Sequence, residues 1–583
     1  MPTPASPYLA DSAEWRPDRF YRHADLTRLL ETWVAAHPDL AKLESIGKTY
    51  EGRDIWCVTL TNTQTGPHHE KPAYFIDANV HAGEVTGSTV ALYTIQWLLG
   101  EYGRDALATR LLDETALYIV PRVSADGAER FLTSAESLRS SVRPYPDAEA
   151  PEGFHRADMD GDGAILSMRV ADPHGPFKVS ELDARVLIPR APDEVGGTYY
   201  WLLPEGRLSD HDPARDGLVG EIQPAVTAYG LDLNRNFPAH WKPDTTNSGG
   251  GAYPLSEPET RAIAAFMLAR RNITGSQHYH TFSGVILRPS TIRPDADFHK
   301  EDMKRYQALG AIGTEETGYA CIAIHEEFLT DKKDPHGGLL LDWAYDHLGL
   351  ITFSTELWSL GLHIGLKAAE KPLDFYFGKD RSEADEVAML RWVDEQLGGF
   401  GFTPWRAFDH PQLGPVEIGG WHYKYVIQNA PGPVLEALCE QNMRFTLRAA
   451  ACAPRLVVGE TRVERLGAEV WRVEAVIENA GFLPTNVTER AIAQKAAKPD
   501  KACLKPGEGV ERLAGEAEQV LGFIPGRAGQ FAPPPISGGS GRPNRRKVSW
   551  VVKAAEGAEV TVEARSERGG TARKVIRLEA AST

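Results

Sequence analysis

Histidine and carboxylate residues at metal-ligand spacing lie in two segments that are far apart in this chain. His81 and Glu84 are three residues apart in Asn-Val-His-Ala-Gly-Glu, and His278 and His280 are two apart much further on. Two imidazole nitrogens with one carboxylate form a common ligand set of catalytic zinc sites, which keep a fourth position for water. An isolated His-x-x-Glu pair is a weak signal, because Glu is also favoured at a helix start by the dipole. His278 and His280 would share one face of a strand, so both stay open as the third ligand.

A second set of polar residues has the chemistry to bind a substrate and to activate water. Arg235 offers a planar guanidinium that suits a carboxylate, and Asn234 adds an amide donor beside it. Asp232 can accept the free ring N–H of a metal-bound histidine. Glu356 follows an apolar segment, where a buried carboxylate is costly unless it is used or paired. We expect Glu356 to be a general base; the structural alternatives are a buried ion pair there and a polar turn at 232–236.

Short apolar segments precede these polar groups. Between the apolar segments lie stretches whose apolar residues recur at helical spacing. Residues 91, 95 and 99 are apolar at helical spacing, and Ser256-Glu-Pro-Glu259 is typical of a capping box that opens a helix through Phe266. This alternation predicts an α/β domain with helices covering a largely parallel or mixed sheet, which binds its ligands at strand ends. The predicted strands are 74–76, 117–120, 273–279 and 350–354.

The composition changes along the chain and predicts more than one domain. At 583 residues the chain exceeds what one core normally holds. We expect a catalytic domain at 20–400 with an insertion at about 130–225, which is rich in Pro, Asp, Gly and Arg. Residues 401–454 are predicted to be a linker with a helix. Residues 455–583 show strand alternation, as in Trp471-Arg-Val-Glu-Ala-Val-Ile477, and predict an all-β sandwich.

Charge and cysteine content limit the function classes. The net charge of −17 argues against nucleic acid or an anionic membrane as a partner. Five cysteines without CxxC spacing indicate reduced thiols rather than a disulfide framework. Neither a signal peptide nor an apolar run of about 20 residues is visible. We therefore expect a soluble cytoplasmic protein.

Taken together, the motifs resemble those of the zinc carboxypeptidase family that includes carboxypeptidases A and B. The resemblance covers most of residues 20–400 and rests on six motifs in the family's order. These are His81-x-x-Glu84, Ser124-Ala-Asp-Gly127, Asp232-x-Asn-Arg-Asn236, His280-Thr-Phe-Ser-Gly284, Gly337-Gly338 followed by Asp342-Trp343, and Phe353-Ser-Thr-Glu-Leu357.

The resemblance implies a role for each matched residue and a peptide substrate. It implies a mixed-sheet α/β carboxypeptidase fold with one zinc ion held by His81, Glu84 and His280. Glu356 would be the catalytic base, and Asn234 with Arg235 would bind the terminal carboxylate of a peptide. Asp232 would support a zinc-bound histidine. Family members also use an upstream arginine to polarise the scissile carbonyl, for which Arg169 is our candidate.

The chain departs from the family pattern at two positions near the expected site. The residue before the zinc-binding Glu is Arg in carboxypeptidase A and is Gly83 here. The family's mobile Tyr has no counterpart in the segment 328–336, which contains no Tyr. Leu340 and Leu341 precede Asp342 in the region that lines the family's terminal side-chain pocket. We therefore expect a preference for apolar C-terminal residues.

A second metal site is suggested by an acidic, glycine-containing loop. Asp158, Asp160 and Asp162 alternate as in the first half of a calcium loop, with Gly163 after them. The twelfth position is Arg169 rather than the bidentate Glu that calcium loops use. The alternatives are calcium bound to this loop and an acidic surface loop without metal.

Two further functions stay open beside a metallocarboxypeptidase that hydrolyses the C-terminal peptide bond. One is a related amidohydrolase for N-acyl amino acids or γ-D-glutamyl cell-wall peptides, which would use the same zinc and Glu356. The other is a non-catalytic peptide-binding protein, which a missing ligand or base would favour. All of these residues are present in the chain.

Overall fold

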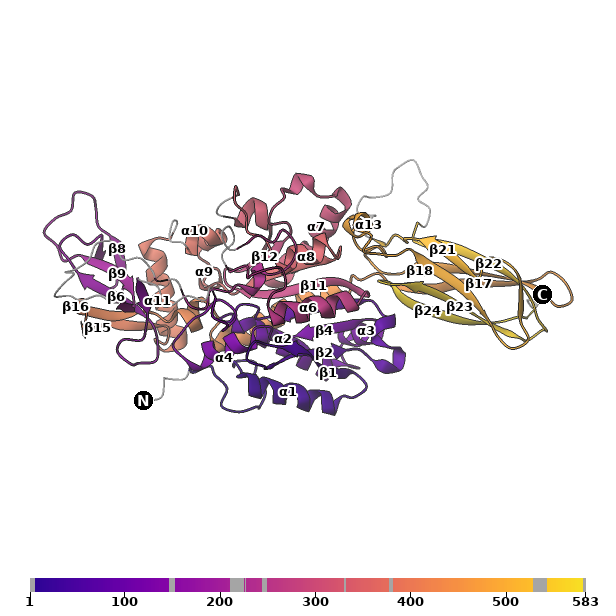
Figure 1. Ribbon diagram of the computed structural model, residues 1–583, viewed down its shortest axis with the longest axis horizontal. Helices are drawn as coiled ribbons and strands as arrows, with labels where there is room; N and C mark the ends of the chain where they lie inside the picture. Colours follow the sequence, from indigo (N-terminus) through magenta and orange to yellow (C-terminus); the bar gives the residue numbers. More distant parts are fainter. Residues whose placement is uncertain are drawn as a thin grey trace.

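The computed structural model arranges the chain as a central α/β region between two β-rich regions (Figure 1). It describes residues 6–145, 153–209, 225, 227–243, 249–329, 332–376, 381–527 and 543–579. The central region carries the predicted site. The sheet at one end includes the insertion, and the chain ends in the β domain at the other.

The central region is built on an eight-stranded mixed sheet, as the sequence predicted. Its strand order is β1-β2-β4-β3-β11-β14-β12-β13. The four middle strands β4, β3, β11 and β14 run parallel, whereas β1, β2 and β12 add antiparallel pairs. All four predicted strands are present, with bounds that differ by a few residues. The strands are β1 (Ala41–Lys48), β2 (Asp54–Leu60), β3 (Ala73–Ala78), β4 (Ala116–Val120), β11 (Ile273–Thr281), β12 (Val285–Arg288), β13 (Ala320–Ala323) and β14 (Ile351–Leu357).

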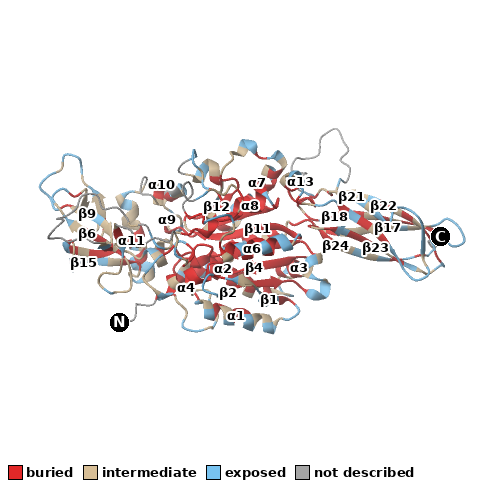
Figure 2. Ribbon diagram, in the orientation of Figure 1, coloured by how far each residue is buried: buried red, intermediate tan, exposed pale blue. Residues whose placement is uncertain are grey.

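Helices bury both faces of this sheet (Figure 2). Alternation along β3 sends Tyr74 and Ile76 into one apolar cluster and Phe75 into the other. The first cluster includes side chains of α1, α2, α3, α7 and α12, and the second includes those of α6 and α8. No described helix combines the length and apolar character needed to cross a membrane. The helices are α1 (His23–Ala36), α2 (Val85–Glu101), α3 (Ala106–Glu114), α4 (Ala125–Thr133), α6 (Pro258–Ala269), α7 (Lys300–Thr317), α8 (Leu340–Asp346) and α12 (Gly432–Ala450).

The start of α6 differs from the predicted capping box. The N-cap residue is Glu257, one residue later than expected, and it makes no side-chain cap bond. Its carboxylate instead accepts two hydrogen bonds from Arg143, at 2.9 and 2.7 Å. Ser256 also donates to it, at 2.7 Å. The ion pair to Arg143 thus replaces the local cap.

Residues 401–454 are not a linker, which corrects the sequence prediction. The strands β15 and β16 extend a six-stranded sheet of order β15-β16-β6-β9-β7-β8, in which β16 pairs with β6 of the insertion. The physical reason is a shared apolar cluster, in which Phe154, Leu166 and Met168 of the insertion pack with Val416 and Ile418. The helix α12 then packs on α2 and α7. The strands are β6 (Ser167–Ala171), β7 (Phe177–Val179), β8 (Leu187–Pro189), β9 (Tyr200–Pro204), β15 (Phe402–His410) and β16 (Gly414–Trp421), and a separate hairpin pairs β5 (Phe154–Arg156) with β10 (Gly206–Leu208).

The C-terminal region is an all-β sandwich of two antiparallel four-stranded sheets, as the alternation predicted. Their orders are β17-β18-β22-β20 and β21-β19-β23-β24. Trp471, Val473 and Ile477 of one sheet pack against Val560 and Val562 of the other in one buried cluster. The strands are β17 (Leu456–Arg465), β18 (Val470–Asn479), β19 (Asp500–Pro506), β20 (Glu511–Ala514), β21 (Glu518–Gly522), β22 (Arg545–Lys553), β23 (Glu559–Ser566) and β24 (Gly570–Arg577).

A buried arginine joins the sandwich to the central region. The Arg568 guanidinium donates to the carbonyl oxygens of Gly349 at 2.9 Å, Asn486 at 3.0 Å and Leu348 at 2.5 Å. Leu348 and Gly349 lie between α8 and β14. Because Arg568 is 3% exposed, water cannot replace these bonds.

Replacing Arg568 with Ala should lower the thermal midpoint of the protein. The change removes a donor from three buried carbonyls. Gly349 O and Asn486 O keep bonds from Thr488, whereas Leu348 O loses the donor that binds it, at a cost of about 1–3 kcal/mol. The matched control is Arg455→Ala, which removes a half-exposed ion pair with Glu114 at the same junction and should cost less than ~1 kcal/mol. Differential scanning calorimetry of both variants would measure the difference. Equal midpoints would contradict a structural role for Arg568.

Candidate active site

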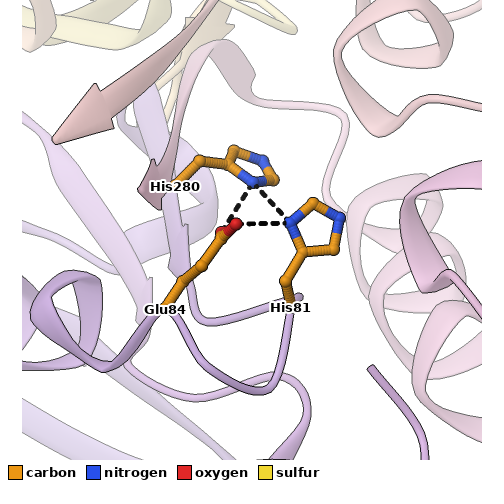
Figure 3. A group of neighbouring side chains, drawn as sticks. All are labelled: His81, Glu84 and His280. Carbon is orange, nitrogen blue, oxygen red and sulfur yellow. Dashed lines mark hydrogen bonds and ion pairs between the residues drawn. The ribbon is translucent and has the colours of Figure 1, made fainter. Parts of the chain in front are cut away.

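His81, Glu84 and His280 form one buried cluster of metal-ligand atoms (Figure 3). His81 Nδ1 lies 2.9 Å from Glu84 Oε1 and 3.1 Å from His280 Nδ1, and His280 Nδ1 lies 3.0 Å from Glu84 Oε2. Ligands about 2.0–2.1 Å from a tetrahedral zinc are about 3.3 Å apart. The donor types, their separations and their burial therefore fit zinc.

The turn that carries His81 is shaped by Asn79 at the end of β3. Asn79 has a φ of 60°, which Asn tolerates better than most residues. Its amide donates to the carbonyls of His81 at 2.6 Å and Ala82 at 3.1 Å, and its oxygen accepts from Ser88. Glu84 is the N-cap residue of α2. A strand end and a helix start thus fix the three-residue spacing of His81 and Glu84.

Parallel pairing places His280 beside Glu356. In the register of β11 and β14, His280 is opposite Glu356. Paired residues on neighbouring strands project to the same face of a sheet. Burial and the negative charge of Glu84 raise the pKa of Glu356 well above its usual range. The carboxylate expected to accept a proton is therefore next to the ligand cluster and more basic than a free Glu.

His278, the alternative third ligand, belongs to a closed network in the sheet. Its Nδ1 contacts Asp77 Oδ1, and its Nε2 lies 3.0 Å from both Ser276 Oγ and Thr352 Oγ1. Asp77, His278 and Ser276 follow the contact order of a serine-hydrolase triad. All three are at most 1% exposed, so no substrate reaches them. His278 is a satisfied core histidine.

Asp232 links the ligand cluster to the predicted carboxylate-binding residues. Its Oδ1 lies 3.1 Å from His81 Nε2, the ring nitrogen that points away from the cluster. Burial opposes ionisation of Asp232, but Arg139, Arg235 and His81 hold its pKa well below the usual range. Such a partner fixes the tautomer of a metal-bound histidine. The same Oδ1 accepts from Asn234 N at 2.8 Å, which orders the following turn.

The turn η3 (Leu233–Arg235) presents Asn234 and Arg235 beside this acid. Asn234 Oδ1 accepts from Leu340 N at 2.9 Å, so its Nδ2 is the donor end of the amide. Arg235 Nη1 donates to Asn234 O at 2.9 Å and lies 3.7 Å from Asp232. The structure therefore brings Asp232, Asn234 and Arg235 to the ligand cluster, as the motif predicted.

Arg139, which the sequence analysis did not select, is the arginine beside the ligand cluster. Its Nε donates to Asp232 Oδ2 at 2.9 Å, and its Nη1 lies 3.9 Å from Glu84 Oε1. The backbone explains this place, because Ala82 N donates to Arg139 O at 2.8 Å. The only sequence signal is its position shortly after the Ser124–Gly127 motif, ahead of the irregular part of the insertion.

The structure places Arg169, the arginine predicted from the sequence, in the second sheet rather than beside the ligand cluster. It lies on β6, directly opposite Glu417 of β16. Its Nε and Nη2 donate to the Glu417 carboxylate at 2.8 and 3.1 Å, and the guanidinium packs over the rings of Tyr200 and Trp405. These contacts hold Arg169 in the second sheet, apart from β11 (Figure 1). Register within that sheet, which the sequence does not reveal, decides its partner.

Gly127 and Gly338, which belong to two of the six motifs, lie where another segment of the chain passes too close for a side chain. A Cβ at Gly127 would lie 2.0 Å from Ser140 O and 2.7 Å from the Ala82 Cβ, so only Gly lets the Arg139 segment run against the His81 loop. Gly338 has a φ of +78°, and its Cβ would lie 2.0 Å from Arg235 O. Both glycines thus position arginines of the site.

The acidic loop 158–163 does not support the calcium prediction. Asp158 and Asp160 lie close to Glu205, but the Arg406 guanidinium binds Asp160 and also Asp162, the latter at 2.6 Å. The Asp158 carboxylate accepts from the backbone N–H groups of residues 161 and 163. An internal cation and local hydrogen bonds therefore satisfy the carboxylates that a calcium ion would use.

The chain belongs to the zinc carboxypeptidase family. The family model matches residues 26–160 and 203–369, just over half of the chain. This family is zinc-dependent and acts on peptides. A second match, to a domain of unknown function called DUF8731, covers residues 455–577, which form the sandwich. The resemblance noted from the six motifs is confirmed.

Curated relatives match only part of the chain. Carboxypeptidase D of Drosophila melanogaster is 30% identical over 168 residues, 26% of this chain and 12% of the relative. A zinc carboxypeptidase of Saccharothrix mutabilis subsp. capreolus is 33% identical over 125 residues, 21% of this chain and 28% of the relative. The chain thus spans well under a third of the length of these relatives.

Solved structures of carboxypeptidase type are similar over a larger share of the chain. Thrombin activatable fibrinolysis inhibitor aligns with a TM-score of 0.38 at 20% identity, covering 65% of this chain and 76% of that one. Carboxypeptidase A from Helicoverpa armigera aligns with a TM-score of 0.37 at 14% identity, covering 67% and 78%.

We predict that His280→Ala loses bound zinc, whereas Glu356→Gln retains it. The first change removes one of three ligands, and the second changes a neighbour outside the ligand set. Inductively coupled plasma mass spectrometry of dialysed protein would give the zinc content, expected to fall from about one to near zero per chain. Full zinc content in the His280 variant would show that another residue is the third ligand.

Proposed function

We propose that this protein is a zinc-dependent metallocarboxypeptidase that releases the C-terminal residue of peptides. One observation carries the proposal, the grouping of three elements around a buried His-Glu-His cluster. Glu356 is paired with His280 of this cluster across two strands. Asp232 contacts His81 of the cluster and also the turn that carries Asn234 and Arg235. Family membership supports the same reaction.

The metal would be held by His81, Glu84 and His280, with Asp232 orienting the His81 ring. Zinc at such a site polarises a carbonyl and lowers the pKa of water to about 7. The ligand set offers one carboxylate and two neutral imidazoles, so a net positive charge remains to attract the substrate carbonyl.

The remaining residues divide the work of peptide hydrolysis. Arg235 and the Nδ2 of Asn234 bind the terminal carboxylate through charge-assisted hydrogen bonds. Glu356 takes a proton from the attacking water and gives it to the leaving amine. Arg139, in place of the predicted Arg169, donates to the oxygen on which negative charge develops. Its side chain is 46% exposed although its Nε is bound to Asp232, so part of the guanidinium stays accessible.

An apolar preference at the C-terminal residue is supported by the surroundings of Leu341. It packs with Val285, Leu287, Ile324 and Leu339 in one apolar cluster. Leu340, the other predicted wall residue, instead packs in the core with Leu233. Leu341 alone is therefore the proposed wall.

The amidohydrolase for N-acyl amino acids or γ-D-glutamyl cell-wall peptides stays as second candidate. It is supported by Gly83, which lacks the side chain that carboxypeptidase A has before its zinc-binding Glu, and by Gln428, whose side chain packs at this position. The predicted cytoplasmic location and the predicted absence of nucleic-acid and membrane partners stay predictions.

The test is a library of peptides with free-acid and amidated C-termini, incubated with and without a chelator. We expect mass spectrometry to detect loss of single C-terminal residues from the free acids only, and Leu or Phe to leave faster than Lys or Arg. Chelation should abolish the release. Cleavage of amidated peptides would exclude the proposed carboxylate recognition, and turnover of γ-D-glutamyl substrates alone would favour the second candidate.

The variant Glu356→Gln should lose turnover by about 10²–10⁴-fold while keeping its zinc, because Gln cannot accept the proton. Steady-state kinetics on the best library peptide, with zinc content measured in parallel, checks this. Unchanged turnover would show that Glu356 is not the base. Zinc retained by a wild-type protein that turns over no peptide would favour the peptide-binding alternative.

Arg139 and Arg169 form a matched pair of variants. Arg139→Ala should reduce kcat by about 10²–10³-fold, the usual effect of removing one oxyanion donor. Arg169→Ala breaks an ion pair in the second sheet and should leave kcat within about twofold. The same kinetic assay compares both. A larger loss of kcat in the Arg169 variant would restore the original assignment.

A further inference from the structure

A short segment outside the family match is built into the edge of the candidate site. The turn η7 (Tyr423–Ile427) and the two residues after it follow β16 and lie beyond the matched ranges. Asn429 Nδ2 donates to Gly83 O at 2.7 Å, and its Oδ1 accepts from Thr86 N at 2.9 Å and Thr86 Oγ1 at 3.0 Å. The segment therefore caps the start of α2, next to Glu84.

The departure from the family pattern at Gly83 follows from this packing. A Cβ at position 83 would lie 2.7 Å from Gln428 Nε2 and 2.9 Å from Phe131 Cε2. Real Cβ atoms essentially never make contacts this short, so a larger side chain at position 83 would displace the Gln428 amide and the Phe131 ring. The space that an outer substrate contact would need is occupied by residues of η7 and its continuation.

Tyr423 is the residue that this segment presents toward the site. Its ring lies 5.8 Å from that of Phe282, edge to face, and Phe282 follows His280 by two residues. Burial and the negative charge of Glu84, partly offset by Arg139, raise the pKa of Tyr423 to about 12. Tyr423 is 46% exposed, so a substrate can reach it.

Hydrogen bonds anchor the backbone beside Tyr423, and Tyr423 lines a cavity. The next residue, Lys424, donates to the carbonyls of Phe131 and Ser134 at 2.8 Å each. Its own carbonyl accepts from Asn429 Nδ2 at 2.8 Å, which restrains the backbone of the turn. The cavity has a volume of about 1240 Å³, and Tyr423 and Tyr229 are among its lining residues. Short π-helical turns of this kind are frequent at functional sites.

We propose that Tyr423, together with Phe282, contacts the substrate residue directly upstream of the scissile bond and favours an aromatic side chain there. The inference rests on the proposed function, which places the terminal residue at Asn234 and Arg235. The preceding substrate residue then lies across the ligand cluster from this pair, where Phe282 follows His280 and Tyr423 packs against the Phe282 ring. Two aromatic rings at right angles offer an edge and a face for a third.

The test uses two blocked dipeptides with the same C-terminal Leu, N-acyl-Phe-Leu and N-acyl-Gly-Leu. Tyr423→Ala should reduce kcat/KM for the Phe substrate by about two- to tenfold more than for the Gly substrate, the range expected for one aromatic contact. Tyr423→Phe keeps the ring and should keep the preference. Tyr50→Ala, which removes an exposed Tyr elsewhere, is the matched control and should change neither.

A binding experiment separates this inference from the proposed function. Calorimetric titration of both dipeptides into zinc-loaded Glu356→Gln protein, with and without Tyr423→Ala, needs no turnover. Weaker binding of the Phe peptide alone in the double variant supports the contact even where the wild type turns over neither peptide. Equal losses for both peptides, a loss in Tyr423→Phe as large as in Tyr423→Ala, or binding of neither peptide would overturn it.

Discussion

The parallel pairing of β11 with β3 and β14 is the constraint on which the site depends. This pairing brings the end of β11 between the strand that leads to His81 and the strand that carries Glu356. A shift of one residue in β11 would turn His280 to the opposite face and bring Tyr279 forward. The buried apolar residues of these strands, which alternate between two clusters, therefore also set the chemistry.

The charges around the ligand cluster balance one another at short range. Glu84, Asp232 and Glu356 gather three carboxylates in a region that excludes water, and Arg139 and Arg235 bring two guanidinium groups to them. Neither set would be stable alone, because an unpaired buried charge costs several kcal/mol. A divalent cation would complete this balance where the ring nitrogens of His81 and His280 meet the Glu84 carboxylate. The arrangement thus accounts for both stability and metal selection.

The regions outside the family match are structural partners of the central sheet rather than appendages. The insertion needs β15 and β16 to bury its apolar face, and α12 covers the helices of the central sheet. The segment between β16 and α12 is held at both ends by these contacts, which lets it approach the His81 loop closely enough to require Gly83. Residues outside the family match therefore contact the loop that carries two of the three metal-ligand candidates.

The sequence by itself determined the α/β class and the β-sandwich, because local periodicity encodes them. The candidates His81, Glu84, Asp232, Asn234, Arg235 and Glu356 came from short motifs, and their roles came from the family resemblance. The linker prediction failed since strand pairing between residues 167–171 and 414–421 is non-local. For the same reason the sequence did not single out Arg139, whose place beside the ligand cluster depends on a contact between segments 57 residues apart along the chain. The choice between His278 and His280 needed the resemblance. Only the tertiary structure showed why the two histidines differ in their surroundings. One of them is enclosed by Asp77 and Thr352, while the other reaches the end of the sheet.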